Sequence, residues 1–180
     1  MLNSFKQYIL FKSQFFVDTK TTNVRAGKGG DGLVSFMHVK GNEFAGPDGS
    51  DGGNGAHVIF RADKNLKSLN KINSIYSAED GGPGRAYHMR GKNGEHLVIR
   101  VPVGTIFKKP NDSNFFIDLA NNDTMFIAAR GGAGGKGNYY YLTNENRKPT
   151  QFEHGHLGEE FTFNIELKII ADAALVKKYI

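Results

Sequence analysis

The chain has 180 residues, a formal net charge of +5 and no cysteine. That length suits one domain with short extensions, and the lack of cysteine excludes a disulfide framework or a cysteine-based zinc site. No run of 18 apolar residues occurs, so the sequence predicts no membrane span. The positive charge favours a polyanionic partner, and a merely soluble basic protein is the alternative.

Residues 1–15 form an N-terminal extension in which Lys6 and Lys12 are the only charged side chains. Hydroxyl, apolar and basic residues alternate there, as in an amphipathic mitochondrial presequence. Arginine is absent from this stretch, so a short disordered or helical extension is the alternative interpretation. We expect a location in the mitochondrial matrix, with the cytoplasm as the alternative.

Short segments rich in β-branched and aromatic residues follow, each bounded by Gly, Pro or Asn, and they predict strands. The predicted strands cover 24–26, 33–39, 57–61, 97–101, 105–107, 115–119, 125–129 and 161–169. The last one alternates cleanly, with Phe161, Phe163 and Ile165 on one face. A weak helical pattern covers only 65–75. Strands this short with such turns predict an all-β sandwich or barrel.

Glycine makes up 23 of the 180 residues, and the glycines recur every third position in several blocks. The glycines expected to have a structural role are Gly27, Gly30, Gly46, Gly49, Gly52, Gly55, Gly131, Gly134 and Gly137. Three residues per turn is the repeat of polyproline II, and one glycine per turn lets such helices approach backbone to backbone. Uniform collagen is excluded because the repeat is confined to short blocks, while a flexible glycine-rich linker is the alternative. The pattern predicts left-handed polyproline II helices stacked on a small β-barrel.

Two glycine motifs resemble nucleotide-binding loops but lack essential parts. The block 27–32 matches GxGxxG, yet a β-type apolar run follows it where a helix is required. The block 131–137 is one residue too short for a P-loop and lacks the Ser or Thr that would hold magnesium. His154 and His156 have no partner at metal-ligand spacing. We therefore predict no catalytic site, no metal site and no cofactor on this chain.

Basic residues and a tyrosine lie within or beside the glycine blocks and are candidates for RNA contact. They are Lys28, Arg85, Arg90, Lys92, Lys136, Tyr139, Arg147 and Lys148. Cations neutralise phosphates, and exposed tyrosines stack on unpaired bases. In the alternative interpretation, the tyrosines cover one end of the barrel and the cations keep the protein soluble.

Several ordered motifs carry a resemblance to a known family. They are AGKGGDG at 26–32, VSF at 34–36, GPDG at 46–49, VPVGT at 101–105 and GGAGGKGN at 131–138. In this order they resemble the N-terminal domain of the Obg GTPases over residues 16–170. One departure is the stretch 37–40, which reads MHVK where the family usually carries a basic cluster.

The resemblance implies polyproline II helices over a β-barrel, followed by a Ras-like GTPase domain. It also implies a role in late assembly of the large ribosomal subunit, with the glycine-rich end on ribosomal RNA in the peptidyl-transferase region. We expect a monomer. Residues 171–180 resemble the junction to the GTPase domain, and the sequence stops at Ile180 before any P-loop. We therefore expect GTP and magnesium only in that further domain, which leaves enzymatic activity open for this chain. A protein-interaction scaffold without RNA contact is the alternative function.

Overall fold

The computed structural model describes residues 18–38, 40–41, 45–110 and 112–168. Its strands are β1 (Thr19–Arg25), β2 (Val58–Asp63), β3 (Ile75–Ser77), β4 (Leu97–Pro102), β5 (Thr105–Lys109), β6 (Asp112–Leu119), β7 (Met125–Ala129) and β8 (Glu160–Leu167). They form a five-stranded sheet in the order β3-β1-β8-β5-β6 and a three-stranded sheet in the order β4-β2-β7. Two 3-10 turns, η1 (Leu69–Lys71) and η2 (Asn138–Tyr141), complete the regular structure described. The predicted all-β class is confirmed.

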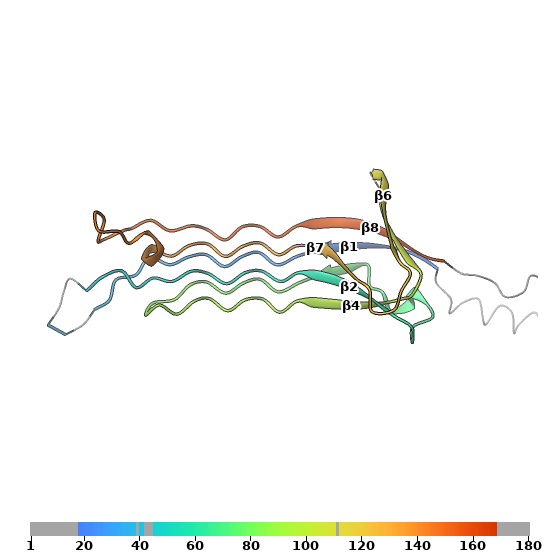
Figure 1. The fold of residues 1–180 in the computed structure, drawn as a ribbon, viewed down its shortest axis with the longest axis horizontal. Helices are drawn as coiled ribbons and strands as arrows, with labels where there is room; N and C mark the ends of the chain where they lie inside the picture. Colours follow the sequence, from blue (N-terminus) through green and yellow to red (C-terminus); the bar gives the residue numbers. More distant parts are fainter. Residues whose placement is uncertain (1–17, 39, 42–44, 111, 169–180) are drawn as a thin grey trace, which may run out of the picture.

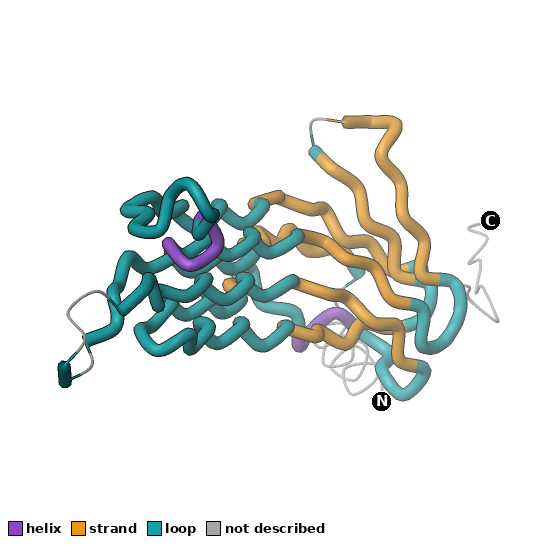
Figure 2. The backbone as a smooth tube through the Cα atoms, turned by 60° about the vertical axis from the view of Figure 1, so that its left-hand side comes forward, coloured by secondary structure: helices purple, strands orange, loops and turns teal. Residues whose placement is uncertain are grey.

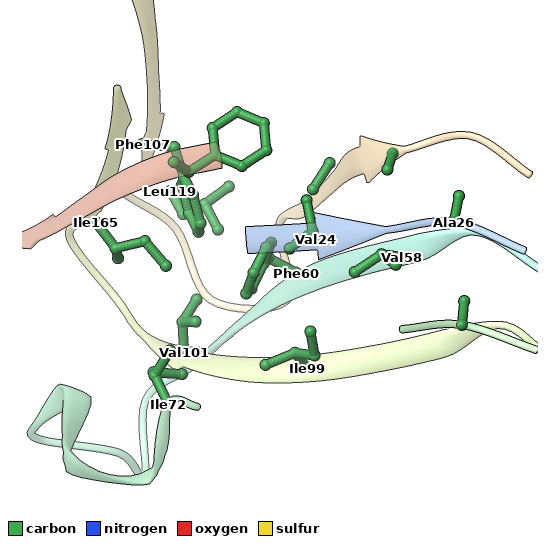
Figure 3. Packing of buried hydrophobic residues seen from close by; sticks show 14 of the residues in the cluster. Val24, Ala26, Val58, Phe60, Ile72, Ile99, Val101, Phe107, Leu119 and Ile165 are labelled. Carbon is green, nitrogen blue, oxygen red and sulfur yellow. The ribbon is translucent and has the colours of Figure 1, made fainter. Parts of the chain in front are cut away.

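The two sheets pack around one core in which aromatic rings supply much of the apolar surface. Phe60 on β2 lies 4.7 Å from the ring of Phe107 on β5, and Phe107 contacts Phe163 on β8 at 6.1 Å between ring centroids. Figure 3 shows side chains from both sheets, including Val24 and Ile99, pointing into this shared interior. Aromatic packing offsets the small number of aliphatic residues in the sequence.

Six glycine-rich segments extend from the sheets and run side by side to the opposite end of the molecule (Figure 1). Together these segments form a shaft. In chain order they are segment A (26–33), segment B (49–57), segment C (78–85), segment D (91–96), segment E (130–137) and segment F (153–159). Segments A, C and E leave β1, β3 and β7, and segments B, D and F return to β2, β4 and β8. The chain thus makes three excursions from the sheets. The β5–β6 hairpin takes no part in them and projects from the body (Figure 2).

Backbone hydrogen bonds join the segments in groups of three, in which each segment bonds to the next and the third bonds back to the first. Along a segment, bonds to the same neighbour repeat every three residues. N–H groups of segment A donate to segment B, those of segment B to segment E, and those of segment E back to segment A. The bonds of this group are Gly27 to Ala56, Gly30 to Gly53, Leu33 to Ser50, Gly52 to Gly135, Gly55 to Gly132, Gly132 to Gly27, Gly135 to Gly30 and Asn138 to Leu33, at 2.8–3.1 Å. A three-residue repeat of partners is the signature of polyproline II, which has no hydrogen bonds within a segment.

Glycine is needed in the shaft because the neighbouring backbones touch. At every glycine except Gly41, Gly46, Gly82 and Gly104, an added Cβ would meet an atom of another segment or loop closer than 3.0 Å. The nearest atom is almost always a backbone carbonyl oxygen. This oxygen cannot move without disturbing the hydrogen bonds that tie its segment to the neighbouring segments. Gly104 has a different role, since its φ of 82° belongs to the turn between β4 and β5.

Two elements predicted from the sequence are wrong. Residues 33–38 form no strand beyond a single bridge between Phe36 and Pro47, because residues 46–48 pair only with residues 35–37, while Leu33 bonds to Ser50 and Asn138 as part of the shaft. Val39 lies outside the described residues. The weak helical pattern over 65–75 is a 3-10 turn, η1, which is followed by strand β3. Strand β3 escaped prediction because it is three residues long and pairs only with β1, in parallel.

Replacing one shaft glycine tests how closely the segments approach. An added Cβ at Gly52 would overlap the carbonyl of Gly30, whereas at Gly46 it would meet nothing within 4 Å. We expect Gly52→Ala to lower the free energy of unfolding by about 3 kcal/mol or more, and Gly46→Ala to change it by no more than about 0.5 kcal/mol. Urea unfolding followed by circular dichroism measures both values, and equal stabilities would contradict the packing described.

Candidate nucleic-acid interface

The end of the shaft away from the sheets, which we call the tip, consists of residues 46–51, 85–90 and 138–149. Asn138, at the start of η2, is fully buried there and joins the loop between segments A and B to the loop between segments E and F. Its Oδ1 accepts the Gly49 N–H at 3.0 Å, and its Nδ2 donates to the Ser35 and Pro149 carbonyls at 2.9 and 3.2 Å. The asparagine side chain suits this position because its carbonyl oxygen accepts hydrogen bonds while its NH₂ group donates them.

The turn between segments C and D holds two consecutive residues in the left-handed region. Tyr87 has a φ of 59° and His88 a φ of 57°, a conformation that non-glycine residues adopt at an energetic cost. The buried Asp48 holds the turn, since its Oδ2 accepts the Tyr87 N–H at 2.9 Å and its carbonyl accepts the His88 N–H at 3.0 Å. The side chains of Tyr87 and Met89 are left 65% and 51% exposed.

Aromatic rings from η2 and the turn border a cleft of about 490 Å³. Tyr139 and Tyr140 are both more than half exposed, and the ring of His88 lies edge-on to Tyr139 at 4.4 Å. The Lys136 ammonium lies 4.8 Å from the centre of the Tyr140 ring. This combination of exposed ring faces and a nearby cation is the usual surface for stacking on unpaired bases.

The structure gathers most of the sequence-predicted cations at or near the tip. Arg85, Arg90 and Arg147 are exposed there, and none of them forms an ion pair with a described residue. Arg147 also borders a second cleft, of about 630 Å³, beside Gly46 and Pro47. Their guanidinium groups are available for phosphates.

The other candidate cations differ in position or in partners. Lys136 forms an ion pair with Asp51 at 3.1 Å, and Lys148 is exposed in the loop after η2. Lys92 lies on segment D, where its carbonyl accepts the Gly82 N–H at 2.7 Å. Lys28 lies on segment A closer to the sheets and pairs with Asp31 at 3.2 Å. Lys28 is therefore separate from the tip cluster.

Neither nucleotide-like glycine block has the geometry of a phosphate loop. In 27–32 the glycine N–H groups all donate to carbonyls of neighbouring segments, and in 131–137 they donate to carbonyls or to side chains of segment B. A phosphate loop instead needs several N–H groups that converge on open space. These glycines hold the shaft together.

Hydrogen bonds shift the titration of acidic groups along the shaft and tip. Burial raises the pKa of the Asp48 carboxyl, but the Tyr87 N–H, the Ser35 hydroxyl and nearby His88 outweigh it, so the pKa lies below its ordinary value. The Gly155 N–H and the Lys28 ammonium lower the pKa of Asp31. For Asp51, burial opposes a net lowering of the pKa by the Gly137 N–H and Lys136. A hydrogen bond to Glu153 raises the pKa of Tyr141 to about 12.

Asn138, Asp48 and the strained turn were not identified as site residues from the sequence. Asn138 closes the glycine block 131–138, but nothing in a single sequence distinguishes a buried asparagine from an exposed one. Asp48 follows Pro47, a position that suggests an ordinary turn. Their roles depend largely on contacts with distant residues, such as Tyr87 for Asp48, 39 positions away, and Ser35 for Asn138, 103 positions away.

These features define an all-β protein class in which a rigid polyproline II shaft carries an aromatic and basic tip. The chain belongs to the GTP1/OBG family, whose model matches residues 17–169. It is 44% identical to GTPase Obg of Mycoplasma capricolum and 42% identical to GTPase Obg of Brachyspira hyodysenteriae, each over 163 residues. GTPase Obg of Prochlorococcus marinus is 39% identical.

Each of these three matches covers 89% of this chain. The chain in turn spans only 38%, 24% and 50% of the length of the three relatives, in the order named. The region that the family model matches, 17–169, contains all the strands described above, from β1 to β8. Among the described residues, no helix is long and apolar enough to cross a membrane.

The lowered pKa values predict that acid destabilises the fold. Asp31, Asp48 and Asp51 stabilise it fully above the ordinary aspartate pKa of 3.8, and this contribution is lost as the pH falls through their lower folded values. We expect the free energy of unfolding, measured in urea between pH about 6 and about 2, to decrease at the acidic end.

Asp48→Asn should lower the stability at neutral pH and flatten its decrease in acid. The control is Glu145→Gln, which removes an exposed carboxylate of the tip that accepts no hydrogen bond from a described residue. A stability that is constant over the whole range, or equal slopes for the two variants, would contradict the assignment.

Proposed function

We propose that this chain is the RNA-docking part of an Obg-type GTPase and that its tip binds ribosomal RNA of the large subunit during assembly. The observation that carries the proposal is the tip itself, whose loops carry both exposed tyrosine rings and exposed guanidinium groups that form no ion pair with a described residue. Arginine binds phosphate oxygens, and tyrosine stacks on bases that are not paired. The names of the relatives, which are GTPases, support the family part of the proposal.

The shaft supports docking because it holds the tip at a fixed distance from the sheets. A segment of eight polyproline II residues extends roughly 25 Å at about 3.1 Å per residue. Backbone hydrogen bonds in every turn tie each segment to its neighbours, so the tip is preorganised for binding. Such a narrow extension fits a deep RNA cleft that a globular surface cannot enter.

GTP hydrolysis belongs, in this proposal, to the part of the relatives that this chain does not span. We assign GTP and magnesium to that part, and to this chain the positioning of the enzyme on the ribosomal particle. A monomer suffices for this role, because one shaft carries the complete tip.

A protein-binding scaffold is the second candidate function, favoured by the apolar side chains at the tip. Tyr87, Met89 and Leu142 are 65%, 51% and 41% exposed, and exposed apolar groups gathered in this way often mark protein contacts. The two functions differ in electrostatics. Binding to RNA releases counterions and weakens steeply with salt, whereas an apolar protein contact does not.

Salt dependence therefore tests the docking proposal. We expect the chain to co-sediment with purified large ribosomal subunits, with an affinity that falls steeply as salt rises. The triple variant Arg85→Gln, Arg90→Gln and Arg147→Gln should reduce the slope of log affinity against log salt by roughly two to three, because each lost phosphate contact contributes about 0.7–0.9.

The control removes three exposed charges from the sheet end with Lys64→Gln, Lys67→Gln and Lys71→Gln. It should leave the slope close to that of the unmodified chain. No co-sedimentation at low salt would contradict RNA docking, and binding that is insensitive to salt would favour the protein scaffold.

We also propose the mitochondrial matrix as the site of action, on the basis of the basic and apolar pattern before Asp18. Residues 1–17 lie outside the described residues, so this remains a sequence prediction. Fused to a fluorescent protein in a eukaryotic cell, residues 1–17 should direct it into mitochondria. Lys6→Glu with Lys12→Glu should abolish import, and Lys6→Arg with Lys12→Arg should preserve it; a cytoplasmic signal from the unmodified fusion would contradict the proposal.

A further inference from the structure

Segments with no internal hydrogen bonds leave some N–H groups facing away from neighbouring carbonyls, and polar side chains accept these groups. Three side chains of segment B, spaced three residues apart, accept N–H groups of segment E. The pairs are Asp51 with Gly137 at 2.9 Å, Asn54 with Gly134 at 3.0 Å and His57 with Gly131 at 2.7 Å. The spacing keeps all three acceptors on one face of the segment.

A second set of acceptors comes from segment D and receives N–H groups of segment B. The Asn93 Oδ1 accepts the Asn54 N–H at 2.8 Å, and the His96 Nδ1 accepts the His57 N–H at 3.1 Å. The rings of His57 and His96 stack with centroids 4.6 Å apart and planes 4° from parallel. Two asparagines and two histidines thus lie side by side on segments B and D.

These bonds determine which atom of each of the four side chains accepts a hydrogen bond and which can donate one. Because each asparagine uses Oδ1 as the acceptor, its Nδ2 remains as a donor, and because each histidine uses Nδ1 as the acceptor, the ring proton lies on Nε2. Among the described residues, none of these four nitrogen atoms has a hydrogen-bond partner. All four free groups are therefore N–H donors.

The four residues that carry these donors border a cleft of about 310 Å³ between segments B, D and E. It is lined by Asn54, His57, Asn93 and His96 and by the backbone of 94 and 131–133, with no acidic residue in the lining. Burial, together with His96 and Arg130, lowers the pKa of His57 and favours its neutral form. Glu159 acts on His57 from outside this lining and opposes the lowering of its pKa, and no carboxylate lies among the residues that line the cleft itself.

We propose that this cleft binds a phosphate oxyanion through the Nδ2 groups of Asn54 and Asn93 and the Nε2 groups of His57 and His96. Phosphate offers several acceptor oxygens at once and can receive all of these donors. Either inorganic phosphate or a backbone phosphate of RNA supplies this group. The RNA source rests on the proposed function and would extend the RNA contact from the tip onto the shaft.

Titration of the full chain with inorganic phosphate, followed by NMR of the asparagine side-chain amides and histidine rings, tests the site. We expect saturable shifts at Asn54, Asn93, His57 and His96. In Asn93→Asp, the carboxylate still accepts the Asn54 N–H but replaces a donor with a negative charge, so binding should weaken by at least about tenfold.

The matched control is Asn121→Asp, which adds the same charge in the exposed turn between β6 and β7. It should bind phosphate as the unmodified chain does. If phosphate causes no saturable shifts, or if Asn93→Asp and Asn121→Asp bind it equally, the oxyanion site is overturned.

Binding of a single-stranded RNA oligonucleotide separates the two phosphate sources. If Asn93→Asp weakens RNA binding more than Asn121→Asp, the RNA backbone is the ligand. If the arginine triple variant of the tip weakens RNA binding while Asn93→Asp does not, the RNA source is overturned and inorganic phosphate is the ligand. If phosphate binds and RNA does not, the cleft is supported and the proposed RNA docking fails.

Discussion

Backbone contact between polyproline II segments is the constraint on which the rest of this structure depends. Such segments form no hydrogen bonds internally, so each N–H and carbonyl inside the shaft needs a partner on another segment. The bonds between segments A, B and E are 2.8–3.1 Å long, which requires the chains to lie too close for a Cβ at positions such as Gly52 and Gly55. Glycine here enforces rigidity, although in a linker the same residue provides flexibility.

The shaft determines the form of the candidate sites. Its outward segments end in loops that Asn138 and Asp48 tie together, so exposed rings and cations occur on a preorganised surface. The turn holds Tyr87 and His88 in a strained conformation, which the surrounding hydrogen bonds maintain. The same need to satisfy N–H groups gives Asn54 and His57 acceptor roles, and their remaining groups become the donors of the cleft between segments B, D and E.

The glycine repeat and the alternation of β8 carried most of the fold prediction. Phe163 and Ile165 are buried as their alternation predicts, and strand β7 has its predicted bounds. The predicted strand at 33–39 failed for a physical reason, because a strand requires a partner along its length and Phe36 finds only Pro47. Short apolar segments in one sequence do not reveal which other segment will pair with them.

The sequence by itself determined the all-β class, the glycine spacing and the residue types available for an RNA contact, because periodicity and composition are local properties. Only the tertiary structure decided which residues share a surface. It brought Arg85, Arg90 and Arg147 to the tip, left Lys28 paired on the shaft, and made the Nδ1 atoms of His57 and His96 acceptors of backbone N–H groups. Those outcomes depend on hydrogen bonds between segments far apart in the chain, and no local pattern encodes them.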